Sequence, residues 1–518
     1  CEILAKDGRV FDRYDTPFGV RKIAWTNEGF FLNGKRVQLD GMCTHQDHAG
    51  IGVAVPVAVH KWRLEQILKM GSNALRWAHN PFDPAVLDLC DRMGILVYAE
   101  QRKTGSSPEL LGQLERMLRR DRNHPSIIIW GIGNEEKLVQ QDDEMAKKYA
   151  TPMAEKVRAM DKTRPITLGA NTGAGGELSN IVDVQGYNYF LMMSDHERDN
   201  NGLTPDSFHK KFPEKPVFLS EESSNLWTRG QYQYRPERNA LSAYDLPNPT
   251  RHWIPTMQAS WDFIKARPWI AGAFMWTAID YRGEPEFRWP SVGSFFGLMD
   301  SCGFPKDPYY FYQSIWADEP MMHVYPHWNW KPGAREIPLQ VWTNLDEVTL
   351  QYNGIDYGKR RVNRGQPAEW RLQYTPGKLV VRGYKNGELV KETVIETTGE
   401  PARVALESDR PSYLADGLDT AMIKVFARDG QGRAVPDADK LIRFEIEGPA
   451  KIIGLGNGNP NSHEPDKASQ RWLFNGLAQV IVQSDGTPGK VTLRALCDGL
   501  QTAELGLDFL PAPAPPRL

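Results

Sequence analysis

Two apolar runs in the sequence end in acidic residues, and acids placed in this way could hydrolyse a sugar. Residues 127–136 read IIIWGIGNEE and residues 216–222 read PVFLSEE. A strand this apolar is covered on both faces, as in a parallel sheet, so the polar side chains at its carboxyl end face a cleft. Two carboxylates that flank one bond are the equipment of glycoside hydrolysis. The two segments therefore indicate sugar chemistry.

Each segment offers two neighbouring acids, Glu135 and Glu136 in the first and Glu221 and Glu222 in the second. Side chains alternate along a strand, so the two members of a pair cannot both point inward. Hydrolysis with retention of configuration needs one protonated carboxyl group and one carboxylate about 5 Å away. Sequence spacing alone leaves open which acid of each pair is the functional one.

The composition suits a carbohydrate partner. The net charge of −3 gives no basic field for nucleic acid or an anionic membrane, and no run reaches the roughly 18 apolar residues of a membrane span. The 16 Trp and 18 Tyr suit stacking against sugar rings. The five cysteines lack the paired spacing of a disulfide framework or a zinc site. No cofactor is indicated.

A closed barrel should position the acidic segments. From about residue 26 to 280, short apolar strands alternate with amphipathic helices, which is typical of parallel βα units. Helices are predicted at 84–93, behind Asp83 and before Gly94, and at 108–121, behind Ser107. Eight units imply a (β/α)8 TIM barrel, with strands expected at 37–42, 73–77, 95–100, 126–135, 166–170, 183–188, 217–221 and 271–276.

Two β-sandwich domains are expected after the barrel. Beyond about residue 320 the helical period gives way to two-residue alternation, and Asn353-Gly354 and Asn386-Gly387 mark hairpin turns. A second change falls near residue 399, so that two sandwiches of immunoglobulin-like type are predicted. The expected domains are the barrel at 26–318, sandwiches at 319–398 and 399–510, and a proline-rich tail at 511–518.

The first residues are expected to belong to a domain that lies upstream. Residues 13–23 read as one closing strand without partners in this chain, and the sequence begins with Cys1 rather than Met. We therefore expect residues 1–25 to close an immunoglobulin-like domain of a longer protein. A signal region would be absent too, and we expect a periplasmic or secreted location.

Several motifs, in order, resemble glycoside hydrolase family 2. They are the HPS run at 124–126 before the strand that ends in Gly133-Asn134-Glu135, the RWAHNP run at 76–81, the LNGK run at 32–35 and the GMCTH run at 41–45. The resemblance spans about residues 12–316. It implies a retaining mechanism in which Glu135 is the general acid/base and Glu221 the nucleophile, while Asn134 holds the sugar 2-hydroxyl.

The resemblance also implies further site residues. His45 and His79 match sugar-binding histidines, Trp276 matches the aromatic floor of the pocket, and Arg76 is expected to position carboxylates. Tyr189 is the expected partner of the nucleophile, although the alignment could place Phe190 there instead. Three loop residues after the eighth strand, Asp280, Tyr281 and Glu284, could bind further hydroxyls.

The resemblance has two departures. After the third strand many family members carry an Asp-Glu element that contributes to a metal site, whereas residues 98–103 read YAEQRK, so no metal is expected. The family's amino-terminal jelly-roll domain has no counterpart here, and in some β-galactosidases it lends a residue to the active site. We expect this part of the chain alone to be less active.

A β-galactosidase is the expected activity, on terminal β-D-galactosyl residues of an oligosaccharide or polysaccharide. A β-glucuronidase is the enzymatic alternative, but its Asn-x-Lys pair is not found in the loop that runs to Lys306. A carbohydrate-binding protein without turnover is the alternative from another class. A homo-oligomer is compatible with the sequence.

Overall fold

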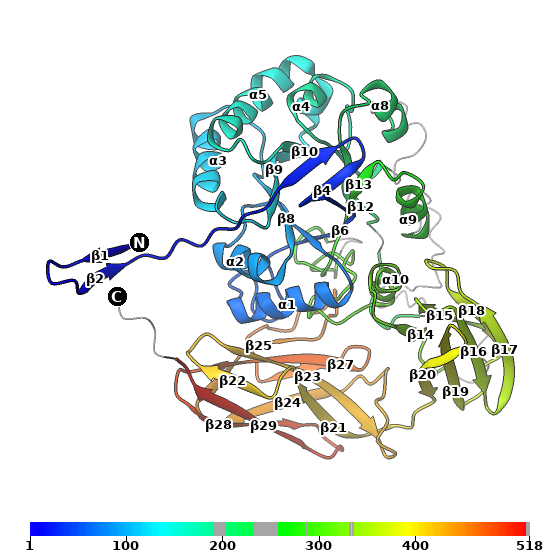
Figure 1. Cartoon of the computed structure of the whole chain (residues 1–518). Coiled ribbons are helices and arrows are strands. Elements are labelled where there is room, and N and C mark those ends of the chain that lie inside the picture. The colour runs from blue at the N-terminus through cyan, green and yellow to red at the C-terminus, as the bar shows by residue number, and fades with distance from the viewer. Residues whose placement is uncertain are drawn as a thin grey trace.

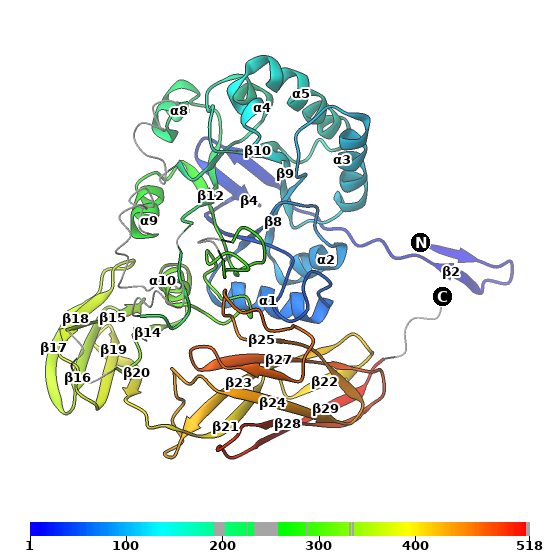
Figure 2. The same cartoon turned by 180° about the vertical axis from the view of Figure 1, so that it is seen from behind.

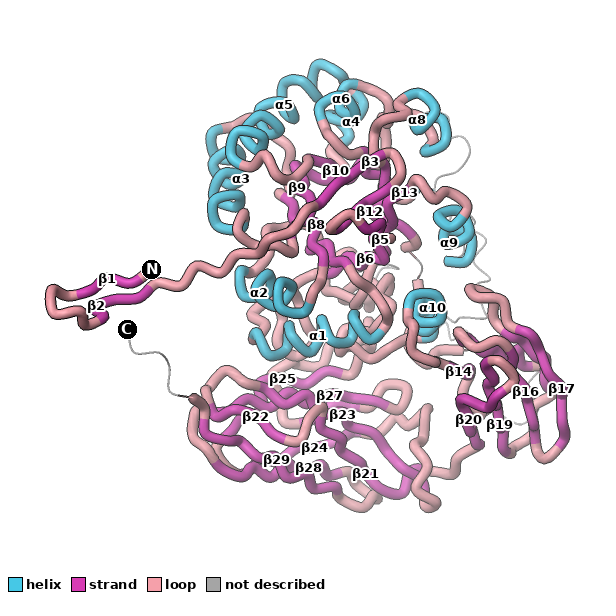
Figure 3. Tube along the Cα trace, viewed as in Figure 1, coloured by secondary structure: helices cyan, strands magenta, loops and turns pink. Residues whose placement is uncertain are grey.

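The computed structural model describes residues 1–190, 202–224, 226–232, 257–285, 289–330, 333 and 336–513. A barrel carries one β-rich body at its side and a second beneath it, and a hairpin near the amino terminus projects away from it (Figures 1 and 2). Helices surround the barrel, whereas the two other bodies consist of strands and loops (Figure 3). The predicted fold class, a TIM barrel followed by two β-sandwiches, is confirmed.

The barrel closes through eight parallel strands in the order β10-β11-β12-β13-β6-β7-β8-β9. Every strand predicted for it is present, within two residues at each end. All eight residues of β9 are buried, as expected for a strand covered by helices outside and by side chains inside. The strands are β6 (Leu39–Thr44), β7 (Ala74–Trp77), β8 (Leu96–Glu100), β9 (Ile127–Asn134), β10 (Ile166–Ala170), β11 (Gln185–Asn188), β12 (Val217–Glu222) and β13 (Ile270–Met275).

The helices begin and end where their capping residues predict. Asp83 accepts a hydrogen bond from the backbone N–H of Ala85, and Gly94 ends α2 with φ of 74°. Ser107 caps α3 in the same way. The described helices are α1 (Val57–Lys69), α2 (Pro84–Met93), α3 (Pro108–Asp121), α4 (Lys137–Gln141), α5 (Asp143–Met160), α6 (Glu177–Ile181), α8 (Pro205–Lys211), α9 (Met257–Lys265) and α10 (Asp307–Trp316).

A small antiparallel sheet closes the amino-terminal end of the barrel. It consists of β3 (Ile23–Thr26), β4 (Gly29–Leu32) and β5 (Lys35–Val37). Trp25 donates a hydrogen bond to the carbonyl of Ile128, at the start of β9, and its ring packs against Phe218. The acids that follow or end β9 and β12 therefore lie at the opposite, carboxyl-terminal end of the barrel.

The opening segment does not form the single strand expected of residues 13–23. It forms a hairpin of β1 (Glu2–Leu4) and β2 (Val10–Arg13), after which residues 14–22 have no strand partner. Phe18 and Val20 in this stretch are exposed. An unpaired stretch has no ladder to make it a strand, so the closing strand and its assignment to an upstream domain stay predictions.

The first sandwich packs a three-stranded sheet against a four-stranded one. Its predicted turns are confirmed: Asn353 and Gly354 have φ of 49° and 83°, and Asn386 and Gly387 have φ of 52° and 83°, the positive values that two-residue hairpins require. The strands are β14 (Met322–Tyr325), β15 (Ile337–Thr343), β16 (Glu347–Tyr352), β17 (Ile355–Arg361), β18 (Ala368–Leu372), β19 (Lys378–Lys385) and β20 (Glu388–Glu396).

The second sandwich lies against helix α1 of the barrel. Val59 of α1 shares a buried apolar cluster with Met422 and Ile481, and His48 is hydrogen bonded to Gln479 at 2.9 Å. Its strands are β21 (Pro401–Ser408), β22 (Ser412–Ala415), β23 (Thr420–Asp429), β24 (Leu441–Glu447), β25 (Ala450–Gly456), β26 (Gln470–Trp472), β27 (Leu477–Ser484), β28 (Gly489–Leu496) and β29 (Ala503–Pro511). Among the described residues, no helix has the length and hydropathy that a membrane crossing requires.

Candidate active site

Arg76, at the end of β7, joins the carboxyl ends of three other strands. Its guanidinium donates to Glu221 on β12 at 2.6 Å, to Glu100 on β8 at 2.6 Å and to the side-chain oxygen of Asn134 on β9 at 2.8 Å. The Arg76 side chain is fully buried. A planar fork with several donors suits this task, because it fixes two carboxylates and an amide at once. The predicted positioning role agrees with this geometry.

Glu221 is the more confined of the two predicted carboxylates. Its side chain is 2% exposed, and it accepts hydrogen bonds from Arg76 and from the hydroxyl of Tyr189. His79 lies 3.6 Å away through Nε2. A guanidinium and a phenol on one carboxylate stabilise its negative charge and restrict its rotation. The contact of Tyr189 with Glu221 is compatible with its predicted role, which stays a prediction.

Glu135 belongs to the same hydrogen-bonded cluster as Arg76 and Glu221, because the side-chain amide of Asn188 connects it to Asn134. Asn188 on β11 donates through Nδ2 to Glu135 at 3.0 Å and to Asn134 at 2.9 Å. Glu135 has φ of 56°, and its backbone N–H bonds the carbonyl of Gly169 on β10. The positive φ lets the chain leave the strand while Glu135 still reaches the cluster.

The structure shows which acid of each neighbouring pair lies near Arg76, a question that the sequence left open. Glu136 points elsewhere and accepts a hydrogen bond from the backbone N–H of Thr104 at 3.3 Å. Glu222 is buried near Tyr312, and its Oε1 accepts from the N–H of Ser223. Only Glu135 and Glu221 of the four lie in the network around Arg76 and Asn188.

Gly169 leaves the space that this network needs. A Cβ atom at Gly169 would lie 2.5 Å from the side-chain oxygen of Asn134, 3.0 Å from Arg76 and 3.1 Å from Asn188. These neighbours are rigid, because each is hydrogen bonded to the others. A glycine is therefore required here for close approach rather than for its backbone freedom.

The pKa of Glu135 is raised from 4.5 to about 7, mainly by burial and further by the negative charge of Glu221. The unfolded chain ionises Glu135 near its ordinary pKa, whereas the folded chain resists ionisation until about pH 7. The contribution of protonated Glu135 to the free energy of unfolding is therefore fully present below pH 4.5 and is lost as pH rises through the folded-state pKa. Ionisation of Glu135 therefore destabilises the folded state.

We expect the Glu135→Gln variant to be more stable than the parent at pH 8, by up to about 3 kcal/mol, and equally stable at pH 4. Urea unfolding across this pH range measures the difference. Glu155→Gln, at an exposed position of α5, is the control and should show no pH-dependent gain. A Glu135→Gln gain that is the same at every pH would contradict the burial of an ionisable acid.

Two histidines and two other aromatic rings lie beside the carboxylates. His79 stacks on Trp276, with ring centroids 5.4 Å apart, and its Nδ1 is hydrogen bonded to the carboxylate of Glu100 at 2.6 Å. His45 stacks on Tyr281 at 3.8 Å and meets Trp276 edge-on. Burial lowers the pKa of His45 to about 3, so this ring is neutral. The predicted residues His45, His79 and Trp276 are thus brought together.

The Nε2 atom of His45 is buried and has no hydrogen-bond partner among the residues that the structure describes. A buried polar atom left alone is costly, and a bound hydroxyl group would satisfy it. Glu284 is connected to this ring through Tyr281, whose hydroxyl donates to the carboxylate. The structure therefore places Glu284 behind Tyr281, at the edge of the cluster.

Asp280 does not join the cluster. Its carboxylate accepts from the ammonium group of Lys306 at 2.7 Å and from the backbone N–H of Gly297. Both side chains of the ion pair are buried. The sequence suggested a hydroxyl-binding role because Asp280 follows β13, but its charge is used to hold a loop. The predicted contact of Asp280 with sugar hydroxyl groups stays a prediction that these contacts do not support.

Sequence reasoning missed Glu100 and Asn188 as members of the site. Glu100 accepts hydrogen bonds from both Arg76 and His79. Asn188 links the two strands whose ends carry Glu135 and Glu221. Glu100 and Asn188 are the last residues of β8 and β11. The rule that pointed to Glu135, a polar side chain at the end of a buried strand, could have found both.

The HPS run at residues 124–126 has a structural role of its own. His124 is hydrogen bonded through Nδ1 to Asp91 of α2 at 2.7 Å, and Asp91 also accepts from the backbone N–H of Ser126. These bonds tie the start of β9 to α2. Together with Asp88 the pair forms a grouping that could hold a metal ion, but it lies away from Arg76 and its carboxylates.

Replacing Arg76 by Met is expected to destabilise the protein by about 3 to 5 kcal/mol, because Glu100 and Glu221 would be buried without their cation. Chemical unfolding followed by Trp fluorescence measures the loss. Arg119→Met is the matched control, since the Arg119–Glu115 pair lies on the surface of α3 and should contribute at most about 1 kcal/mol. Equal losses would contradict the buried network.

The fold and the cluster define an α/β barrel enzyme scaffold with a carboxylate pair at its carboxyl-terminal face. The chain belongs to glycoside hydrolase family 2: residues 23–238 match the TIM barrel domain of that family and residues 404–506 its C-terminal domain 5. Residues 334–391 match a domain of unknown function. The predicted family is confirmed.

Similar proteins include the β-galactosidase BoGH2A of Bacteroides ovatus, 35% identical over 97% of this chain and 65% of that protein. A putative β-glucuronidase of Formosa agariphila is 31% identical over 92% of this chain and 49% of its own length. A β-glycosidase structure from Bacteroides vulgatus superposes with a TM-score of 0.84 at 30% identity, over 97% of this chain and 68% of that one. The chain thus spans half to two thirds of these relatives.

Proposed function

We propose that the protein is a retaining exo-β-glycosidase that removes terminal β-D-galactosyl residues. One observation carries the proposal: two carboxylates share a hydrogen-bonded cluster but have opposite environments. Glu221 is held by the Arg76 cation, whereas the pKa of Glu135 is raised to about 7 by burial and by Glu221. Such a difference is what an acid and a nucleophile at one bond require.

In the first step, Glu135 gives its proton to the glycosidic oxygen as the bond to the anomeric carbon breaks. Glu221 attacks that carbon from the opposite face and forms a glycosyl ester. In the second step, Glu135, now ionised, removes a proton from water, and the oxygen of this water displaces Glu221. The sugar leaves with its original configuration and both carboxylates return to their starting states.

The neighbouring side chains support these steps. Arg76 and Tyr189 stabilise the charge on Glu221 before attack and after its release. Asn134 uses its side-chain oxygen to accept from Arg76 and Asn188, and its Nδ2, which lies 3.4 Å from Nε2 of His79, has a second hydrogen to donate to the 2-hydroxyl group of the sugar. Strengthening of that bond in the oxocarbenium-like transition state accelerates the reaction. The unpartnered Nε2 of His45 offers a further contact to a hydroxyl group.

A galactoside is preferred to a glucuronide on two grounds. The β-galactosidase BoGH2A is more similar in sequence than the putative β-glucuronidase, at 35% against 31% identity. A glucuronide carries a carboxylate that needs a cation, and Lys306, in the loop after β13, is buried in its ion pair with Asp280. The relatives named β-glucuronidase make this activity the second candidate.

The proposal predicts how activity depends on pH. Glu135 must be protonated in the free enzyme for the first step, so kcat/KM should fall as pH rises through about 7. Initial rates on nitrophenyl β-galactoside from pH 5 to 9 measure this limb. Arg102→Gln, at an exposed position nearby, is the control, and its kcat/KM should fall over the same pH range as that of the parent. A profile that is flat to pH 9 would contradict Glu135 as the acid.

A panel of nitrophenyl glycosides tests the substrate. Hydrolysis of the β-galactoside supports the proposal, and faster hydrolysis of the β-glucuronide replaces it with the second candidate. Binding of galactose without hydrolysis of any glycoside favours a carbohydrate-binding protein. We further propose a periplasmic or secreted location, as for enzymes that degrade external glycans, and cell fractionation of the native source tests it.

A further inference from the structure

Ser220 and Glu221 are consecutive residues of β12, yet both side chains point into the barrel. Ser220 is hydrogen bonded to Asn188, and Glu221 to Arg76. In a regular strand one of the two side chains would face outward. A bulge prevents this, because the β12 partners of two successive β11 residues are Leu219 and Glu221, with Ser220 left between them. Bulges re-aim side chains beside active sites, and this one adds a hydroxyl group to the cluster.

The hydroxyl group of Ser220 determines which way the amide of Asn188 faces. It donates to the side-chain oxygen of Asn188 at 2.6 Å, and both residues are fully buried. Asn188 gives its two N–H hydrogens to Asn134 at 2.9 Å and to Glu135 at 3.0 Å. The reverse orientation would set the amide oxygen against two acceptor oxygens, and it would take the acceptor of the Ser220 hydroxyl group away.

The bulge is held in place on both of its sides. Arg76 donates from Nη1 to the backbone carbonyl of Ser220 at 3.0 Å. On β11, a Cβ atom at Gly186 would lie 2.9 Å from the hydroxyl oxygen of Ser220 and 2.8 Å from the carbonyl oxygen of Leu168. Gly186 therefore leaves the space that the hydroxyl group fills, and close packing of β11 against β12 fixes the position of this group.

The amide of Asn188 acts on the charge of Glu135. A carboxylate that accepts an N–H bond is stabilised in its ionised form and releases its proton more readily. Burial raises the pKa of Glu135 most, and the negative charge of Glu221 raises it further. The bond from Asn188 opposes this rise more strongly than Arg76 and His79 do. The orientation of the amide therefore limits how tightly the buried carboxyl group holds its proton.

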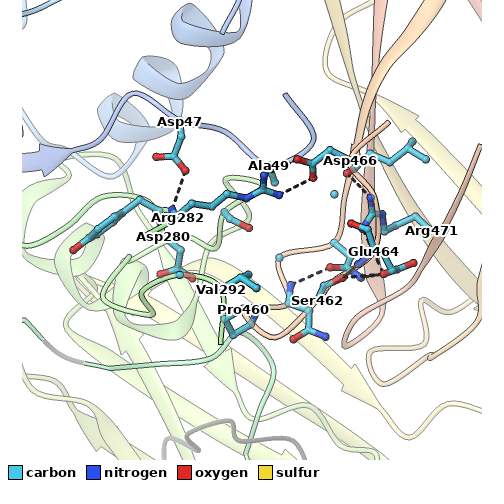
Figure 4. A pocket seen from close by; sticks show the side chains of 18 of the residues that line it. Asp47, Ala49, Asp280, Arg282, Val292, Pro460, Ser462, Glu464, Asp466 and Arg471 are labelled. Atoms are coloured by element: carbon cyan, nitrogen blue, oxygen red, sulfur yellow. Dashed lines mark hydrogen bonds and ion pairs between the residues drawn. The ribbon is translucent and has the colours of Figure 1, made fainter. Parts of the chain in front are cut away.

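Other titratable groups near the mouth of the barrel do not replace this amide. Tyr189, which follows β11, also faces Glu135. Burial holds the pKa of its phenol well above the usual value, so Tyr189 is uncharged where Glu135 titrates. In the loop after β13, the guanidinium group of Arg282 extends to Asp466 of the last sandwich, as Figure 4 shows. The amide of Asn188 is thus the neutral donor on which the titration of Glu135 depends.

We propose that Ser220 is a positioning residue for the acid/base Glu135, because its hydroxyl group holds the amide of Asn188 with the nitrogen toward the carboxyl group. This inference rests on the proposed function, in which Glu135 gives a proton in the first step and takes one from water in the second. A group with both tasks works best when it changes protonation near the working pH. The oriented amide keeps a buried carboxyl group near that range.

The Ser220→Ala variant removes the hydroxyl group and leaves the charged groups of the cluster in place. On nitrophenyl β-galactoside, its kcat/KM should fall at a pH about half a unit higher than in the parent, because Glu135 holds its proton more tightly once the amide can turn. Asn188→Ala, which removes the donor itself, should move this fall by about one unit. Ser72→Ala is the matched control: this buried barrel serine donates to the carbonyl of Asp40 at 2.7 Å, and its loss should not move the fall.

A double variant decides whether Ser220 acts through Asn188. If it does, adding Ser220→Ala to Asn188→Ala should move the fall of kcat/KM no further, since two changes on one path are not additive. The proposal is overturned if Ser220→Ala follows the parent, if its fall moves to lower pH, or if Ser72→Ala moves the fall equally. It is also overturned if Ser220→Ala has the same effect with and without Asn188.

Urea unfolding follows the same titration without turnover. The difference in stability between each variant and its Glu135→Gln counterpart, measured from pH 4 to 9, reports the pKa of Glu135 in the folded state. The midpoint should rise in Ser220→Ala as the fall of kcat/KM does. Hydrolysis by the parent with an unmoved titration removes the role of Ser220 alone. A moved titration without hydrolysis of any glycoside by the parent removes the catalytic proposal alone.

Discussion

Replacing Glu221 by Gly should lower kcat on nitrophenyl β-galactoside by roughly 10⁴-fold or more, the order of loss that follows removal of one member of a cooperating catalytic unit. Without the carboxylate no glycosyl ester can form. Arg76 and Tyr189, which both contact Glu221, would then face an empty space beside the anomeric carbon. Steady-state rates measure the loss.

The chemistry of rescue distinguishes a lost nucleophile from a damaged fold. Sodium azide fits the space left by the side chain of Glu221 and can attack the anomeric carbon from the same face. The product should be α-galactosyl azide, identified by its proton coupling in NMR. Glu222→Gln, on the adjacent buried position, is the control and should remain within tenfold of the parent. Formation of the β-azide would show that Glu221 is not the nucleophile.

The barrel was predictable because its signal is repeated and local. Each strand is a short apolar run, each helix has capping residues such as Asp83 and Ser107, and neither depends on distant contacts. The hairpin turns at Asn353 and Asn386 follow the same logic, since a positive φ is a property of the turn residues themselves. Where local sequence preferences agree with the final fold, as they do here, such features can be predicted from the sequence.

The site was predictable only in part, for a physical reason. That Glu135 and not Glu136 joins the cluster depends on a positive φ at the strand end, and that Asp280 turns to Lys306 depends on a loop that returns from residue 306. Both are decided by contacts between segments far apart in the chain.

Replacing Glu135 by Gly should produce losses that depend on the leaving group. Methyl β-galactoside has a poor leaving group that needs the proton of Glu135, so its hydrolysis should fall by roughly 10⁴-fold. Dinitrophenyl β-galactoside departs without protonation, so its first step should be slowed only slightly. The glycosyl ester on Glu221 then accumulates, because the base for the second step is missing, and a burst of dinitrophenol should precede a slow steady state.

Azide should accelerate that slow second step, because it needs no general base. It would occupy the space of the Glu135 carboxylate, next to Asn188, and attack the ester from the face opposite Glu221. The product should be β-galactosyl azide, the opposite anomer to that from Glu221→Gly. Glu136→Gln removes the neighbouring charge without touching the cluster and should stay within threefold of the parent. Equal losses on both substrates, without a burst, would show that Glu135 supports the fold rather than transferring the proton.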